Sequence, residues 1–359
     1  MVRLLVDRAV WDGSAQALPV SWLDGFQLTT FAADRPDELT AGLARADALL
    51  LRSVTRLTPE ILRVAKDLRA VATLSSGVDH LDPDDLATRG VRLFTGHGGN
   101  ALAVADWVAW ALHRLCGKSL AEKRILVVGV GAVGSAVARR LQAQGALVMR
   151  CDPPRAEREP GFTSMDLDDA LSTGGLDAVT LHVPLEHAGR HPTWHLLDEA
   201  RLRRLAGAVV LNSARGGVLD EEAAAFLRTS GHLAGLAIDT WQGEPRPRTH
   251  AVQACDLATP HLAGHSIEGK LKVAARSVAG LRAFVGLPVD AVDLTTAICE
   301  SVQIRGAHAA LEPFAALDHA TAAFRGSPAT PTPGQVEASL FRAQRHDHAR
   351  IETAGDRRP

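Results

Sequence analysis

Two histidines lie four residues apart in the segment ATPHLAGHSIEG, at His261 and His265. An imidazole titrates near neutral pH, so either ring could move a proton in catalysis. A histidine pair at this spacing could also bind a metal, or it could simply be part of a polar loop. The residues that the fold brings near these rings decide between the three possibilities.

Two other charged residues also follow short apolar runs. Arg215 precedes two glycines in VVLNSARGGVLDE, Glu244 precedes a proline in AIDTWQGEP, and His261 follows DLATP. Ligands of open α/β sheets bind at the carboxyl ends of the strands, where we expect all three residues. Taken alone, each residue also has an ordinary explanation, as an arginine in an ion pair, a surface glutamate and a loop-capping histidine.

A glycine-rich segment predicts a cofactor site. RILVVGVGAVGSAVARRL is typical of a buried strand, a loop over residues 129–134 and a helix. The first glycine permits the tight turn, the second lets a pyrophosphate approach the backbone, and the third lets helix and strand pack closely. The helix that follows offers free N–H groups to the phosphates. We therefore expect a dinucleotide to contact Gly129, Gly131, Ala132, Val133 and Gly134.

Asp152 ends the next apolar run, ALVMRCD. A carboxylate at this position can bind the adenosine ribose hydroxyls of NAD, and it would repel the 2′-phosphate of NADP. Two alternatives remain, because Asp152 could instead cap a turn before Pro153 and Pro154, and Arg155 could bind that phosphate. The sequence favours NAD.

Together these residues indicate hydride transfer. A hydride that moves between nicotinamide and a carbinol carbon must be matched by a proton on the carbinol oxygen, and histidine suits that role. A carboxylate on the other ring nitrogen would orient the imidazole and favour its charged form. An arginine could bind the carboxylate of a 2-oxo acid and polarise the adjacent carbonyl.

The apolar runs also predict the fold. Short runs rich in Val, Leu and Ile alternate with segments of helical length, as in βα units around a parallel sheet. One set ends near Thr95, a helix is expected at about residues 100–116, and a second set runs from RILVVG to DLATPH. Uniformly apolar strands are expected where helices cover both faces of a sheet. The expected fold class is α/β, with two doubly wound parallel-sheet domains.

Composition excludes several classes of protein. The chain has 359 residues, 46% of them apolar and 22% charged, with a net charge of −2, so it has no general attraction to nucleic acid or anionic membranes. Its four cysteines form no CxxC pair, which argues against a disulfide framework or a zinc knuckle. The N-terminus does not look like a signal peptide, and we expect a cytoplasmic protein.

The chain resembles the D-2-hydroxyacid dehydrogenase family over about residues 1–288. GVDHLD, GVGAVG, LHVPL, LNSARGGVLDE, DTWQGEP and PHLAG fall in the family's order. The resemblance implies a flavodoxin-like substrate domain of residues 1–96 and 266–288, and a Rossmann NAD-binding domain of residues 97–265. Residues 289–359 would form a small C-terminal segment, resembling a shortened dimerisation domain, so a homodimer is expected.

Two segments, CDPPRAER and HLAGHSIEGK, resemble a branch of the family that oxidises a phosphorylated 2-hydroxy acid. Other members, acting on phosphoglycerate, glycerate or hydroxypyruvate, remain the alternative. A protein that binds NAD(H) as a sensor without catalysis is a third possibility.

The resemblance also implies roles for individual residues. Arg215, Glu244 and His261 match the catalytic residues of the family, with His261 as the acid–base group. Ser53 and Ser75 match substrate-binding positions, and His265 stands where a substrate-contacting tyrosine is usual. No metal is implied. Contacts with NAD are implied for Asp152, Val183, Ala214, Arg215, Asp239 and Gly264.

One further site follows from the run LLLRSVT, which places Arg52 and Ser53 side by side at a strand end. Arg52 could bind the phosphate of the substrate through forked hydrogen bonds, with Ser53 as a further donor. The alternative is an arginine that pairs with a neighbouring carboxylate.

Overall fold

The computed structural model describes residues 1–10, 18–294, 321, 322, 324 and 325 of the chain. These residues belong to two compact units. The first contains residues 1–100 and the described residues from 266 to 294, and the second contains residues 101–265 and the four described residues after 320. Apart from residues 289–294, 321, 322, 324 and 325, the C-terminal segment expected over residues 289–359 lies outside the described residues.

The first unit is built on a five-stranded parallel sheet with the strand order β2-β1-β3-β4-β5. This is the order of flavodoxin-like folds, in which the chain starts near the middle and winds outward in both directions. The sequence-based prediction of a doubly wound sheet is confirmed for this unit. The strands are β1 (Val2–Asp7), β2 (Phe26–Phe31), β3 (Ala48–Leu51), β4 (Ala70–Thr73) and β5 (Arg92–Thr95).

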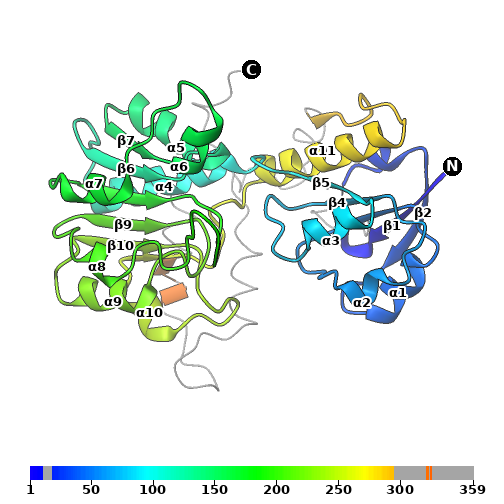
Figure 1. Cartoon of the computed structure of the whole chain (residues 1–359), viewed down its shortest axis with the longest axis horizontal. Helices are drawn as coiled ribbons and strands as arrows, with labels where there is room; N and C mark the ends of the chain where they lie inside the picture. The colour runs from blue at the N-terminus through cyan, green and yellow to red at the C-terminus, as the bar shows by residue number, and fades with distance from the viewer. Residues whose placement is uncertain (11–17, 295–320, 323, 326–359) are drawn as a thin grey trace. The chain divides into compact units, whose positions relative to one another are not determined.

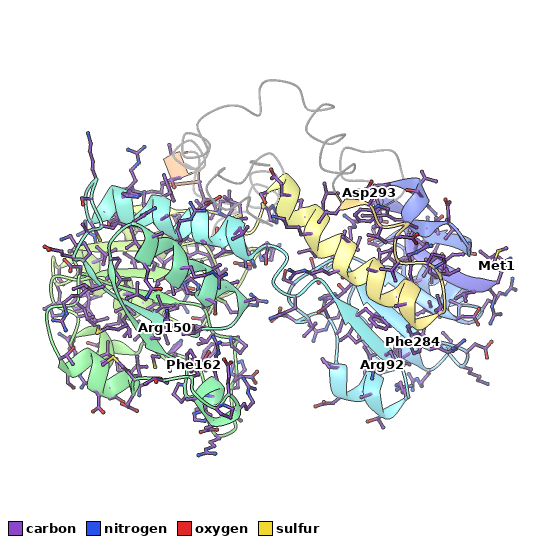
Figure 2. All side chains as sticks on the ribbon, turned by 90° about the horizontal axis from the view of Figure 1, so that it is seen from above. Met1, Arg92, Arg150, Phe162, Phe284 and Asp293 are labelled. Carbon is purple, nitrogen blue, oxygen red and sulfur yellow. The ribbon has the colours of Figure 1, made fainter. Side chains whose placement is uncertain are left out.

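Helices cover both faces of this sheet. Leucines of α1 (Pro36–Leu43), α2 (Pro59–Leu62) and α3 (Pro83–Thr88) pack against Leu5, Leu49 and Val71 on one face. On the other face α11 (Ile267–Phe284) lies along β4 and β5 (Figure 1). Near its end, the ring of Phe284 lies 5.6 Å from that of Phe94 in β5, close to the start of the strand at Arg92 (Figure 2). Short 3-10 helices, η1 (Arg8–Val10) and η2 (Val20–Leu23), complete the unit.

The second unit is built on a six-stranded parallel sheet with the order β11-β10-β9-β8-β6-β7. The chain moves outward from β6 to β7 and then returns to the opposite side of β6 with β8, so the strand order reverses between β6 and β8. Open α/β sheets bind ligands at such a reversal, beyond the carboxyl ends of the strands. The strands are β6 (Arg124–Val128), β7 (Leu147–Cys151), β8 (Ala178–Leu181), β9 (Val209–Asn212), β10 (Gly235–Ile238) and β11 (Leu257–Ala258).

Alternating side chains of β6 show why this sheet is buried on both faces. Ile125 and Val127 pack with α4 (Ala101–Leu115) and α5 (Ala132–Ala143), whereas Leu126 and Val128 pack in the cluster on the other face. Each fully buried aliphatic side chain contributes roughly 1.5–3 kcal/mol relative to exposure.

The remaining helices of this unit supply the second face. Apolar residues of α7 (Leu167–Ser172), α8 (Glu199–Leu202), α9 (Glu221–Thr229) and α10 (Thr249–Ala254) join the same cluster as Leu126. Helices α8, α9 and α10 lie together beside β10 (Figure 1), and α6 (Pro153–Arg158) follows β7. Among the described helices, none combines the length and apolar character needed to cross a membrane.

Candidate active site

The three residues proposed for proton transfer and substrate binding follow adjacent strands of the second unit. Arg215 follows β9, Glu244 follows β10 and His261 follows β11. Because these strands are parallel neighbours, their carboxyl ends lie at the same edge of the sheet. The fold therefore gathers residues that are far apart in the sequence.

His261 and Glu244 form a direct pair. Nδ1 of His261 lies 2.7 Å from Oε2 of Glu244, and the two side chains are about 30% and 24% exposed. The other carboxylate oxygen of Glu244 accepts a hydrogen bond of 2.7 Å from the backbone N–H of Trp241, which fixes the rotamer of the glutamate. Since Nδ1 is engaged, Nε2 is the ring nitrogen left for a proton transfer.

The backbone at His261 is held in an unusual conformation. Its φ angle is +53°, a left-handed value that costs a non-glycine residue roughly 1–2 kcal/mol. The backbone N–H of His261 donates to the carbonyl oxygen of Asp239 at 2.7 Å, which helps to hold the residue in place. A costly conformation that its surroundings enforce is typical of functional sites.

The side chain of Asp239 organises the loop that follows His261. It is 1% exposed, and Oδ1 accepts hydrogen bonds from Oγ1 of Thr259 at 2.5 Å and from the backbone N–H of Leu262 at 2.7 Å. The N–H of Ala263 is also within 3.1 Å of both carboxylate oxygens. Desolvation raises the pKa of Asp239 above its ordinary value. The contact with NAD that the resemblance implied for Asp239 stays a prediction.

Thr259 is itself held by α4, because Nε1 of Trp107 donates to its Oγ1 at 3.0 Å. A polar chain therefore runs from a buried tryptophan of α4, through Thr259, to the aspartate that shapes the His261 loop. Nothing in the sequence singled out Thr259 or this use of Trp107, because the contact joins residues 152 positions apart.

Arg215 lies on a loop that packs against the turn carrying Glu244. A Cβ on Gly216 would lie 1.9 Å from the carbonyl oxygen of Trp241, so only glycine allows the two backbones to approach this closely. The side chain of Asn212 donates to the carbonyl oxygen of Arg215 at 3.0 Å and fixes the loop after β9. The position of the Arg215 backbone is thus tied to that of Glu244 through Gly216.

The glycine loop has the shape that a dinucleotide requires. Gly129 has a φ of +82°, and a Cβ on Gly134 would lie 1.9 Å from the carbonyl oxygen of Gly129. A Cβ on Gly131 would meet nothing within 4 Å, so the backbone is open at the point where α5 begins. These positions match the turn, packing and approach roles of the three glycines.

An open cavity of about 390 Å³ adjoins this loop. Its lining combines the amino-terminal turn of α5 with two cations and one carboxylate, which suits an anionic ligand. The lining residues are Val130, Gly131, Ala132, Ser135, Arg155, Arg158 and Glu159.

Asp152 and Arg155 both bind the backbone of Val130 in the glycine loop. Oδ2 of Asp152 accepts from the Val130 N–H at 2.7 Å, and Nη1 of Arg155 donates to the Val130 carbonyl oxygen at 2.6 Å. Asp152 also caps α6 through Oδ1, which accepts the Arg155 N–H at 2.9 Å. Arg155 pairs with Glu159 and lies 4.2 Å over the ring of Phe162. Asp152 therefore caps a turn, as one alternative expected, and its contact with an adenosine ribose stays a prediction.

The remaining predicted cofactor residues lie at the same edge. Val183 follows β8, and its Cγ1 would lie 2.7 Å from a Cβ on Gly129. Ala214 follows β9 and donates its N–H to Oδ1 of Asn212 at 3.1 Å. Gly264 belongs to the loop after His261, and His265 follows it, donating its N–H to the Leu262 carbonyl oxygen at 2.8 Å.

The predicted substrate residues Arg52, Ser53 and Ser75 belong to the first unit, after β3 and β4. Arg52 donates to the buried carboxylate of Asp7, from Nε at 2.7 Å and from Nη2 at 3.3 Å, so the ion pair kept as an alternative is present. Ser53 is exposed. Ser75 shares a 2.7 Å hydrogen bond with Oγ1 of Thr73. Across the part of the chain that the structure describes, no cluster of three or more His, Cys, Asp or Glu could hold a metal ion.

Comparisons with known proteins agree with this architecture. Residues 96–263 match the NAD-binding domain of the D-isomer specific 2-hydroxyacid dehydrogenases. The erythronate-4-phosphate dehydrogenase of Salinibacter ruber is 43% identical over 241 residues, which are 65% of this chain and 61% of that protein. The enzyme of the same name from Pseudomonas aeruginosa is 41% identical over 236 residues, with the same coverage. The match thus spans less than two thirds of these relatives.

Solved structures share the two-unit fold. The TT0316 protein of Thermus thermophilus is 27% identical, with a TM-score of 0.62 over 79% of this chain and 97% of that chain. An NAD-dependent formate dehydrogenase of Staphylococcus aureus gives a TM-score of 0.62 at 23% identity, over 80% of this chain and 97% of that chain. At that identity, the second likeness concerns the fold alone.

Proposed function

Because residues 96–263 match the NAD-binding domain of the D-isomer specific 2-hydroxyacid dehydrogenases, we propose that the chain belongs to this family and oxidises a 2-hydroxy acid with NAD. The observation that carries the proposal is the 2.7 Å pair of Glu244 and His261. This pair lies at the same sheet edge as a glycine loop that is open to a pyrophosphate. This edge of the sheet would therefore combine a proton acceptor with a dinucleotide site, which are the two parts that such an oxidation needs.

NAD, when bound, would accept the hydride from C2 of the substrate. The backbone at Gly131 and the first turn of α5 would hold its pyrophosphate, and Asp152 would bind the adenosine ribose. Because Asp152 already accepts the N–H of Val130, ribose binding would use the remaining lone pairs of the carboxylate. Electrostatic repulsion of a 2′-phosphate by Asp152 would favour NAD over NADP.

His261 would take the proton of the substrate hydroxyl through Nε2 as the hydride leaves C2. Glu244 would hold the ring through Nδ1 and stabilise the imidazolium that forms. Arg215 would bind the substrate carboxylate and polarise the oxygen on C2. The products are a 2-oxo acid, NADH and a proton on His261, which balances the reaction.

We propose 4-phospho-D-erythronate as the substrate, giving 2-oxo-3-hydroxy-4-phosphobutanoate in the synthesis of pyridoxal phosphate. The names of the curated relatives support this choice. Arg52 would bind the phosphate through Nη1, since Asp7 takes Nε and Nη2 and so orients the guanidinium. Ser53, Ser75 and His265 would complete the substrate contacts.

The test of the phosphate site is Arg52→Ala, with Arg56→Ala as the matched control on the same loop. We expect Arg52→Ala to erase most of the preference for phosphorylated over unphosphorylated erythronate while the affinity for NADH stays unchanged. If the preference survives in Arg52→Ala, the phosphate binds elsewhere.

A panel of 2-hydroxy acids in steady-state assays tests the reaction itself. Preferred turnover of phosphoglycerate or glycerate would move the protein to another member of the family. NADH binding without turnover of any acid would indicate a sensor. We also propose that the protein acts in the cytoplasm as a homodimer. Light scattering of the purified chain would test the oligomeric state.

A further inference from the structure

Glu221 is a buried acidic residue to which the proposed reaction gives no role. It is the first residue of α9, directly after the capping residue Asp220, and it is 4% exposed. Acidic residues are common in the first turn of a helix, where they face the positive end of the helix dipole, but they usually remain in water. Because Glu221 is buried, its carboxyl group needs a hydrogen-bond partner within the protein.

The partner is the turn that carries Glu244. Oε1 of Glu221 accepts a hydrogen bond of 2.5 Å from the backbone N–H of Gln242. In the same turn the N–H of Trp241 donates to Oε1 of Glu244, whose Oε2 meets His261. Two successive backbone amides of the turn are therefore each bound by a glutamate, one from α9 and one from the turn itself.

The other side of this turn contacts the loop of Arg215. A Cβ on Gly216 would lie 1.9 Å from the Trp241 carbonyl oxygen and 2.5 Å from the Gln242 nitrogen. The amide that Glu221 binds is thus also the backbone that abuts Gly216. A displacement of this turn would move Glu244 together with the loop that carries Arg215.

We propose that Glu221 is a positioning residue, which holds the turn of residues 241–244 and thereby sets the placement of both Glu244 and Arg215. This inference rests on the proposed function, because it assigns Glu221 to the same reaction. Glu221 acts through the backbone of Gln242 and touches no reacting atom.

The charges around Glu221 set its protonation state and thereby the kind of hydrogen bond with which it holds the turn. Glu222 from α9 and Glu244 from the turn oppose its ionisation, while Arg248 before α10 and the N–H of Gln242 favour it. The thiol of Cys255, after α10, is a further titratable neighbour. Burial is the largest influence and raises the pKa of Glu221 to about 8. At neutral pH the group is therefore a neutral acid that accepts from Gln242 through its carbonyl oxygen.

Three variants separate positioning from simple packing. Glu221→Gln keeps the size and a carbonyl acceptor but cannot titrate, and Glu221→Asp is too short to reach Gln242. Glu222→Gln is the matched control, since Glu222 lies on the same helix turn but bonds to Arg248 and His250 instead.

The first readout needs no turnover. We expect the Gln242 amide resonance of the native protein to titrate with a midpoint near pH 8, and this transition to be absent in Glu221→Gln and present in Glu222→Gln. A native amide that does not titrate in this range, or one that titrates unchanged in Glu221→Gln, would overturn the assignment even if the protein were no dehydrogenase.

The second readout is catalytic. Glu221→Asp should lower kcat about tenfold to a hundredfold, the scale of small misplacements in an active site, with NADH affinity unchanged within about twofold. Glu221→Gln keeps the carbonyl acceptor and should therefore have the native kcat at neutral pH. Native-like kcat in Glu221→Asp would contradict the positioning role. Absence of turnover in the native protein would instead refute the proposed function and leave the amide titration to decide on Glu221.

Discussion

At the scale of single residues, the hydrogen bond between Glu244 and His261 is the feature from which the proposed chemistry follows. The bond occupies Nδ1 and leaves Nε2 for the substrate. We expect His261→Ala to lower kcat at least about a hundredfold, the lower end of general acid–base contributions, with little change in cofactor affinity. Steady-state kinetics and NADH fluorescence titration would measure both. If His265→Ala proved the more damaging change, the acid–base assignment would be wrong.

Glu244→Gln should be milder than His261→Ala, because the proton carrier remains. The neutral amide no longer stabilises the imidazolium that forms as the substrate is oxidised, so kcat should fall while the affinity for NADH stays unchanged. Steady-state kinetics and NADH fluorescence titration would measure both. A native kcat in Glu244→Gln would show that the glutamate does not act on the histidine.

Asp152 is the residue at which cofactor choice should be decided. We expect the native protein to bind NADH more tightly than NADPH, and Asp152→Ala to narrow this preference without abolishing binding. Fluorescence titration with both reduced cofactors measures it. Tighter NADPH binding by the native protein would contradict the prediction and would implicate Arg155, which lies beside the same loop.

At the scale of elements, Thr259, the residue after β11, is hydrogen-bonded to helix α4. The hydroxyl of Thr259 accepts from Trp107 and donates to Asp239. Thr259→Val would leave both groups buried without this partner, and we expect a loss of about 1–3 kcal/mol in the free energy of unfolding.

Urea denaturation would measure this loss, with Thr88→Val on the exposed surface of α3 as a control expected to change stability by less than about 0.5 kcal/mol. A Thr259→Val variant as stable as the control variant would show that the polar chain contributes little. A lowered kcat in Thr259→Val would extend the role of the chain to the placement of His261.

Local patterns in the sequence were sufficient to predict the two parallel sheets and the strand-end residues, although β2 (Phe26–Phe31) was not among the predicted strands. Apolar runs predicted parallel strands, glycine spacing predicted the cofactor loop, and the order of Arg215, Glu244 and His261 predicted their common edge. The ion pair of Arg52 with Asp7 could be kept only as an alternative, because it joins neighbouring strands 45 residues apart. Glu221 was not predicted, because in sequence it resembles any acidic residue that begins a helix, and its burial depends on the turn after β10.

At the scale of the whole molecule, the division into two units also divides the proposed tasks. The unit of residues 101–265 contains the glycine loop, Arg215, Glu244 and His261, and we expect it to bind the cofactor and carry the proton chemistry. The unit that begins the chain contains Arg52, Ser53 and Ser75, and we expect it to bind the substrate phosphate.

The stability of the molecule should carry a pH signature of Glu221. Its pKa is raised from 4.5 to about 8, so the folded state retains a proton that the unfolded chain has released. This contribution is fully present below pH 4.5 and is lost as the pH rises to about 8. Relative to the native protein, Glu221→Gln should therefore lose less stability between these values. Thermal melts of the two proteins at several pH values would measure this difference. If both melting temperatures changed with pH by the same amount, Glu221 would not be buried as a neutral acid.

The proposed substrate is tested by the ratio of kcat/KM for 4-phosphoerythronate to kcat/KM for erythronate, measured with NAD and the native chain. We predict a ratio of several orders of magnitude in favour of the phosphorylated acid, because erythronate lacks the phosphate with which Arg52 would form charge-assisted hydrogen bonds. Equal values for the two acids would contradict the account and would assign the protein to a different 2-hydroxy acid.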